Sequence, residues 1–169
     1  MGICYYRKRL IPKTSFMTLL ILLFLSCKAK KESTFFTPGE IWKDNNGVPI
    51  NSHGGGILYY NKTYYWYGQH MIEGESGNSA QVGVHVYSSK NLYDWKDLGI
   101  ALKISEDNTY PDISKGCILE RPKVIFNKKT GMFIMWFHLE LKGHGYNSAR
   151  SGVAVSDNPE GTFRYIRSF

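Results

Sequence analysis

The sequence predicts an all-β protein built from two copies of a small antiparallel sheet. Runs of β-branched and aromatic residues recur between clusters of Gly, Asn, Asp and Pro, as in strands joined by tight turns. No apolar repeat of helical period and length follows residue 38. One pattern of strands and turns also occurs twice, at an offset that runs from 67 residues (Ile57 to Val124) to 69 residues (Gly83 to Gly152).

Residues 1–27 are predicted to be a lipoprotein-type signal peptide. A basic section precedes an apolar run at 16–25, which is too short for the roughly 20 residues of a membrane-spanning helix. Ser26-Cys27 follows directly, as in a bacterial lipoprotein cleavage box, so Cys27 is the predicted lipidated N-terminus. An ordinary signal peptide and an uncleaved anchor remain the alternatives.

The positive charge of the chain belongs to this leader. The net charge is +7, from 21 basic and 14 acidic residues. Seven of the basic residues and none of the acidic ones precede Glu32, so 14 residues of each sign remain in 32–169. A neutral folded part predicts no nucleic-acid partner. A lipid on Cys27 and the lysines that follow it predict an exported protein anchored to a membrane, in the periplasm or at the cell surface.

Residues 28–37 are short, polar and basic, and predict a tether that Pro38-Gly39 closes. The folded domain is therefore expected at 38–169. Cys117 is the single cysteine of that range, so no disulfide is expected within it.

The first copy of the repeat begins with a predicted hairpin, in which strands at 57–59 and 64–67 flank a turn at Asn61-Lys62. A third strand is expected at 83–89, and a turn with an aromatic strand at 92–95.

The second copy follows the same order. Its hairpin pairs 124–126 with 133–136 across a longer turn at 127–131. The segments 152–158 and 161–165 correspond to the later strands of the first copy.

Each copy thus supplies three or four antiparallel strands, which is the composition of one propeller blade. A β-sandwich would alternate apolar and polar residues too, but it would not repeat this order at one spacing. Propellers close with roughly 4–8 blades. The chain is therefore expected to hold about two blades of a longer, truncated propeller.

Glu120 is the first candidate for chemistry. Together with Arg121 and Pro122 it is predicted to lie directly before a strand, where proline fixes the approach of the chain. A carboxylate at the mouth of a strand and near aromatic walls fits a buried acid or charge stabiliser, and glycoside cleavage needs carboxylates in pairs. The alternative is a surface ion pair between Glu120 and Arg121.

His53 precedes three glycines, at 54–56, and allows three interpretations. It could hydrogen-bond a sugar ring, to which the missing side chains give close access. The HGGG oxyanion element of lipases and esterases is the second, but it needs a G-x-S-x-G elbow and a βαβ context that the sequence lacks. The third is a turn with a solvated histidine.

The sequence predicts no metal or other cofactor. Its five histidines form no i, i+4 pair on a helix and no Cys/His set of the zinc type.

Five segments taken together resemble glycoside hydrolase family 43, in particular the branch related to exo-β-1,3-galactanases. They are residues 52–58, 64–68, 87–95, 120–125 and 135–138. The resemblance covers about residues 38–169. It implies a five-bladed β-propeller, of which about the first two blades would be present. It also implies inverting hydrolysis of galactan or of arabinose-containing side chains of plant polysaccharides, with a polysaccharide or oligosaccharide as the partner.

By this resemblance, Glu120 corresponds to the carboxylate that tunes the pKa of the catalytic acid and orients the substrate. His53 lies where most of the wider family has its Asp base. Gln69 lies where Trp-Tyr-Gly is usually followed by a sugar-contacting Glu, which predicts weaker or altered sugar binding.

Arg121, His138 and Tyr146 are the further expected contacts to substrate. The resemblance places the general acid on a later blade, beyond Phe169, so this chain alone is expected to be inactive. A non-catalytic glycan-binding lipoprotein is the alternative function. A product that does not fold, because two blades leave open sheet edges, is a third possibility.

Overall fold

The computed structural model describes residues 34–169. The predicted signal peptide, the lipid site at Cys27 and most of the predicted tether lie outside these residues, so they stay predictions. Within 34–169, no helix has the length and apolar character that crossing a membrane requires. The all-β class is confirmed: two four-stranded sheets form the described unit, and two short 3-10 helices join their strands.

The first sheet, blade 1, contains β1 (His53–Tyr60), β2 (Thr63–Met71), β3 (Gln81–Ser89) and β4 (Lys96–Lys103) in sequential antiparallel order. The hairpin predicted between β1 and β2 is confirmed. Its two central residues, Asn61 and Lys62, have φ values of 46° and 58°, the positive angles that a two-residue hairpin turn requires. A 3-10 helix, η1 (Gly77–Ala80), precedes β3.

The second sheet, blade 2, contains β5 (Ile118–Asn127), β6 (Met132–Glu140), β7 (Arg150–Ser156) and β8 (Arg164–Ser168), again in sequential antiparallel order. The short helix η2 (Pro111–Ile113) lies in the connection between the blades. The repeat in the sequence therefore corresponds to two blades of the same topology.

Three boundaries differ from the sequence-based expectations. The last strand, β8, begins at Arg164 rather than at residue 161. Residues 92–95 form a turn rather than an aromatic strand, because the Asn91 Oδ1 accepts the backbone N–H groups of Tyr93 and Asp94, both at 2.9 Å. The fourth strand begins only at Lys96. Glu120 also lies within β5 rather than before a strand, since pairing with β6 already begins at Ile118.

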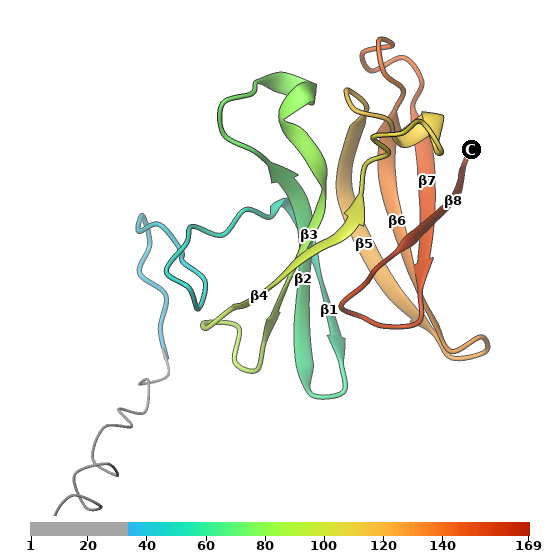
Figure 1. The fold of residues 1–169 in the computed structure, drawn as a ribbon. Helices are drawn as coiled ribbons and strands as arrows, with labels where there is room; N and C mark the ends of the chain where they lie inside the picture. The colour runs from blue at the N-terminus through green and yellow to red at the C-terminus, as the bar shows by residue number, and fades with distance from the viewer. Residues whose placement is uncertain (1–33) are drawn as a thin grey trace, which may run out of the picture. The chain divides into compact units, whose positions relative to one another are not determined.

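The blades pack through their first strands, β1 and β5, which lie next to each other in Figure 1. Alternate residues of each blade face this interface and are buried: Tyr65, Tyr67, Val84 and Val86 from blade 1, and Phe133, Met135, Phe137 and Ala154 from blade 2. Side chains on a strand point to opposite faces in turn, so these residues reach the core while Trp136, between Met135 and Phe137, is exposed.

A buried side chain joins the backbones of the two blades. The side-chain amide of Gln81, at the start of β3, donates to the carbonyl oxygen of Leu119 in β5 and accepts the Leu119 N–H at 3.0 Å. Both residues are inaccessible to solvent, Gln81 at 1% and Leu119 at 0% exposure. Gln81 therefore satisfies two backbone groups that water cannot reach.

The segment before β1 covers the other face of blade 1. Trp42 contacts Trp66 and Trp95 at ring-centroid distances of 5.5 and 6.1 Å, and its indole N–H donates to the Tyr93 carbonyl. Phe36, which the sequence places in the tether, contacts Trp42 at 5.2 Å. The end of the predicted tether thus packs against the first blade.

Asp112 of η2 binds the last strand. Its Oδ2 accepts hydrogen bonds from the hydroxyls of Ser168, at 2.6 Å, and Tyr165, at 2.8 Å, and lies 3.7 Å from the guanidinium of Arg150. The hydrogen bond from Ser168 is the main cause that holds the pKa of Asp112 below its usual value. Partial burial opposes this shift, whereas the hydrogen bond from Tyr165 and the charge of Arg150 add to it.

This arrangement predicts a pH-dependent effect of Asp112→Asn. Because the folded pKa lies below the unfolded one, the stability contributed by Asp112 is complete above the unfolded pKa of 3.8 and is lost as the pH falls through the folded pKa. Urea unfolding should therefore show the variant less stable than the parent chain at neutral pH, with the gap closing in acid. A gap of constant size down to about pH 2 would show that the carboxylate charge has no part in it.

Candidate functional site

The first strands of the two blades are interrupted at equivalent positions. In β1 the register with β2 shifts between His53 and Gly56, and in β5 the register with β6 shifts between Glu120 and Lys123. Such bulges re-aim the side chains around them and are common beside active sites. They place His53 and Glu120, the residues that open each irregularity, at corresponding points of neighbouring blades.

Gly54 and Arg121 occupy the same position within these bulges, with φ values of 59° and 53°. A Cβ atom on Gly54 would lie 3.8 Å from Cγ of Arg121, so the two bulges face each other across the packed strands β1 and β5. The left-handed backbone favours glycine, and Arg121 adopts it without that freedom. Strained backbone of this kind is concentrated at functional sites.

Glu120 is held by two neighbours. Its Oε1 accepts a hydrogen bond from the Tyr146 hydroxyl at 2.7 Å, and its Oε2 lies 3.8 Å from the guanidinium of Arg121. The Glu120 side chain is 19% exposed, whereas that of Arg121 is 72% exposed. The alternative of an ion pair between Glu120 and Arg121 is therefore found, with Arg121 at the surface. Glu120 is less exposed, and its stronger partner is Tyr146.

His138 lies opposite Glu120 on β6. It lies between the hydrogen-bonded pair of Glu120 and Tyr146 and the buried carboxylate of Glu140. Its Nε2 is 3.0 Å from Oε1 of Glu140, and its ring lies parallel to that of Tyr146 within 12°, with centroids 6.0 Å apart. The hydrogen bond to Glu120 is the main cause that raises the pKa of Tyr146, so Tyr146 remains a neutral hydrogen-bond donor well above neutral pH.

His53 and Gln69 form a second pair, opposite each other on β1 and β2. The His53 Nδ1 lies 3.4 Å from the Gln69 Oε1, with Gln69 buried and His53 exposed. His53 is therefore the accessible member of the pair. The six candidate residues fall into two clusters, one on β1 and β2 and the other on β5, β6 and the loop after β6, and the strands β1 and β5 pack against each other.

The neighbouring glycines have a structural role that the sequence did not reveal. A Cβ on Gly55 would lie 2.4 Å from both the indole nitrogen of Trp66 and the carbonyl oxygen of Tyr67. A Cβ on Gly56 would lie 2.8 Å from the carbonyl oxygen of Pro122. Gly55 and Gly56 thus admit the adjacent strands, and the interpretation that the glycines after His53 also admit a sugar stays a prediction.

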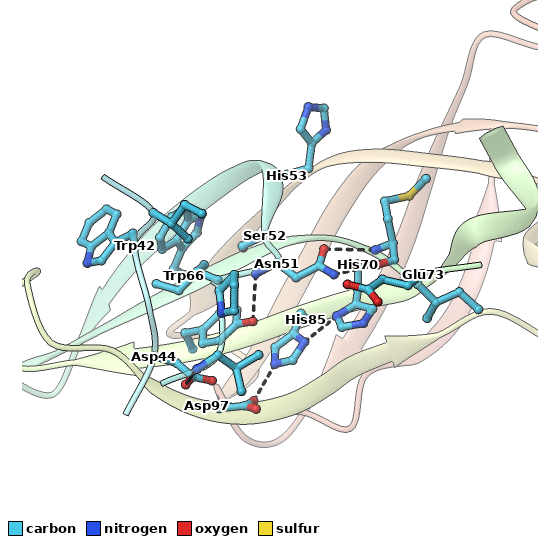
Figure 2. Close-up of a pocket in the computed structure, with 17 residues that line it drawn as sticks. Trp42, Asp44, Asn51, Ser52, His53, Trp66, His70, Glu73, His85 and Asp97 are labelled. Carbon is cyan, nitrogen blue, oxygen red and sulfur yellow. Dashed lines mark hydrogen bonds and ion pairs between the residues drawn. The ribbon is translucent and has the colours of Figure 1, made fainter. Parts of the chain in front are cut away.

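A third polar group, on the opposite face of blade 1, was not found from the sequence. His70 and His85 approach each other through their Nδ1 atoms at 2.8 Å, and the Nε2 of His85 lies 2.6 Å from Asp97. Figure 2 shows this line of three side chains, His70, His85 and Asp97, in a pocket of about 670 Å³ that residues between 41 and 53 help to line. The His53 side chain is directed away from the pocket. The two histidines are diagonal neighbours across β2 and β3, so only the strand register could bring them together.

Burial, followed by the nearby His85, lowers the pKa of His70. Partial burial opposes ionisation of Asp97, but its hydrogen bonds with the His85 ring and with the Gly99 N–H hold its pKa below the usual value. Within residues 34–169, no group of three or more metal-binding side chains is placed to hold a metal ion.

No protein-family model and no curated protein matches this sequence. Among solved structures, a GH43 β-1,3-galactosidase with galactodeoxynojirimycin aligns at 55% identity and a TM-score of 0.73, covering 79% of this chain and 38% of that one. The chain belongs to glycoside hydrolase family 43. Two exo-β-1,3-galactanases of this family support the assignment. That of Phanerochaete chrysosporium aligns at 34% identity with a TM-score of 0.69, and that of Clostridium thermocellum at 40% with 0.66.

This family 43 chain spans about a third of the length of those relatives, between 27% and 38%. Each alignment covers 79% of the present chain. The partial β-propeller predicted from the repeat is therefore confirmed, while the sugar-binding roles of the six candidate residues stay predictions.

Proposed function

We propose that residues 34–169 form the substrate-binding part of a glycoside hydrolase that acts on β-1,3-linked galactan. The names of the similar proteins support the substrate, since they describe β-1,3-galactosidases and exo-β-1,3-galactanases. The observation that carries the proposal is the carboxylate of Glu120, partly exposed and fixed by Tyr146, on the strand that packs against β1 with its accessible His53. Hydrogen bonds to a fixed carboxylate are the usual means of orienting sugar hydroxyls.

The same geometry limits what these residues do chemically. Inverting hydrolysis needs an acid and a base about 6.5–9.5 Å apart on opposite faces of the sugar. Within the described part of the chain, the side chains in contact with Glu120 are Tyr146 and Arg121, and neither is a carboxylate. Glu140, the carboxylate behind them, is 1% exposed and already paired. We therefore assign binding and orientation of the sugar to Glu120 and Tyr146, and expect no hydrolysis by this chain alone.

The test is a calorimetric titration of the chain with galactodeoxynojirimycin, with the glucose-configured iminosugar as the matched control. We expect the galactose-configured probe to bind at least about tenfold more tightly, because the two differ in the orientation of one hydroxyl that a hydrogen-bonding site distinguishes. Equal binding, or none, would contradict the proposal. Incubation with β-1,3-galactobiose should release no galactose, and release would overturn the restriction to binding.

Glu120→Gln is the variant that tests the site directly. It keeps the size of the side chain and an acceptor for Tyr146, but replaces the charge. Hydrogen bonds to charged groups contribute about 1 kcal/mol more than neutral ones, so we expect the galactose-configured probe to bind roughly tenfold more weakly. Glu106→Gln removes an exposed carboxylate elsewhere and should leave the affinity unchanged. Similar losses in both variants would mean that net charge, rather than the site, attracts the probe.

A further inference from the structure

The loop that carries Tyr146 has two backbone hydrogen bonds of its own, from the His144 N–H to the Leu141 carbonyl and from the Asn147 N–H to the His144 carbonyl. It joins β6 to β7 over residues 141–149, and glycines with positive φ, Gly143 and Gly145, precede Tyr146 within it. The Tyr146 side chain is largely exposed, and Ala149 at the end of the loop has a φ of 45° without being glycine. Backbone of this kind keeps one conformation only where its surroundings fix it.

Glu140 supplies that fixation from the last position of β6. Its Oε2 accepts the backbone N–H of Ser148 at 2.7 Å and that of Ala149 at 2.9 Å. These bonds tie the end of the loop back to its beginning, and they stabilise the strained backbone at Ala149. A charged side chain that is 1% exposed is retained only where such hydrogen bonds satisfy it.

The second oxygen of Glu140 acts toward the site. It lies 3.0 Å from Nε2 of His138, whose ring is parallel to that of Tyr146. The Tyr146 hydroxyl completes the series with its 2.7 Å bond to Glu120, the residue opposite His138 in the sheet. One buried carboxylate therefore contacts both the backbone of the loop and the ring beside Tyr146.

We propose that Glu140 is a positioning residue of the sugar site, which fixes the 141–149 loop and His138 so that the Tyr146 hydroxyl meets Glu120. The inference rests on the proposed function for its purpose, but the positioning itself can be measured without sugar. A purely structural Glu140 would affect the stability of the chain and leave Tyr146 where it is.

Two variants and one control separate these roles. Glu140→Ala removes both oxygens, whereas Glu140→Gln keeps the shape and one acceptor for the two loop N–H groups. The control is Asn91→Ala, which removes an equivalent brace: the Asn91 Oδ1 accepts two successive N–H groups in the 92–94 turn of blade 1, away from the site.

The first readout is the titration of the Tyr146 ring, followed by NMR and assigned with Tyr146→Phe. In the parent chain the pKa of Tyr146 is raised, chiefly by its bond to Glu120. We expect Glu140→Ala to return it toward the ordinary value, and Glu140→Gln and Asn91→Ala to leave it raised. A folded Glu140→Ala chain with an unchanged Tyr146 titration would overturn the inference. If that variant does not fold, His138→Ala, at a partly exposed position, should produce the same return, and its failure to do so would count equally against the inference.

The second readout is the affinity for galactodeoxynojirimycin. Glu140→Ala should weaken binding at least about tenfold, as loss of the fixed Tyr146–Glu120 pair implies, with substantial rescue in Glu140→Gln and no change in Asn91→Ala. Equal weakening in Glu140→Ala and Asn91→Ala would attribute the loss to general stability and contradict the inference. If the parent chain binds no probe while the Tyr146 titration responds as expected, the proposed function fails and the positioning role of Glu140 stands.

Discussion

Gln81→Leu is expected to lower the free energy of unfolding by about 4 kcal/mol, because it leaves two buried backbone groups of Leu119 without partners and each costs about 1–3 kcal/mol. Leucine has a similar size, so the loss is one of hydrogen bonding rather than of volume. Folded domains have only about 5–15 kcal/mol of stability in total. The variant should therefore be close to unfolding at room temperature.

Urea unfolding followed by tryptophan fluorescence would measure this loss. Ser88→Ala on the same strand is the matched control, since its hydroxyl has no hydrogen-bond partner within 34–169, and it should change stability by less than about 0.5 kcal/mol. A loss below about 1 kcal/mol in Gln81→Leu would mean that water or a rearranged backbone satisfies Leu119, and that the Gln81 bridge does not hold the blades together.

Gly55→Ala is expected to destabilise the chain by about 3 kcal/mol through steric overlap. The added methyl group would overlap the Tyr67 carbonyl oxygen and the Trp66 indole nitrogen at 2.4 Å, and a backbone oxygen within a sheet cannot move aside. The change should displace Trp66 and disturb the aromatic packing beneath Trp42. Thermal unfolding together with the near-ultraviolet circular dichroism of the tryptophans would report both effects.

The adjacent glycine gives a control of a different kind. Gly54→Ala meets no atom closer than 3.8 Å and pays only for its left-handed backbone, about 1–2 kcal/mol. Gly55→Ala should therefore be the more damaging of the two. The reverse order would mean that backbone conformation, and not close packing of β1 on β2, explains the glycines after His53.

Much of each blade could be predicted from the sequence because the information is local. The turn at Asn61-Lys62 and the aromatic run after it define a hairpin without reference to any distant residue. The fourth strand of blade 1 was misplaced for a local reason too: residues 92–95 have strand-forming side chains, but Asn91 caps the backbone into a turn.

The site was predicted only in part. Glu120 and Tyr146 were both found, but their hydrogen bond depends on a bulge in β5 and on a loop that returns across 26 residues. Glu140 and Gln81 were missed because their partners are backbone N–H and carbonyl groups, which every residue carries and no sequence pattern marks. The line from His70 to Asp97 was missed because it follows from strand register alone.

By itself, the sequence determined the all-β class and the two blades, because alternation, turn residues and repeat spacing are properties of neighbouring residues. The resemblance of five short segments pointed to family 43. Only the tertiary structure decided why three glycines follow His53 and which groups hold Glu120. Those answers depend on distances between β1, β5 and the 141–149 loop, and such distances are set by the packing of one blade on the next.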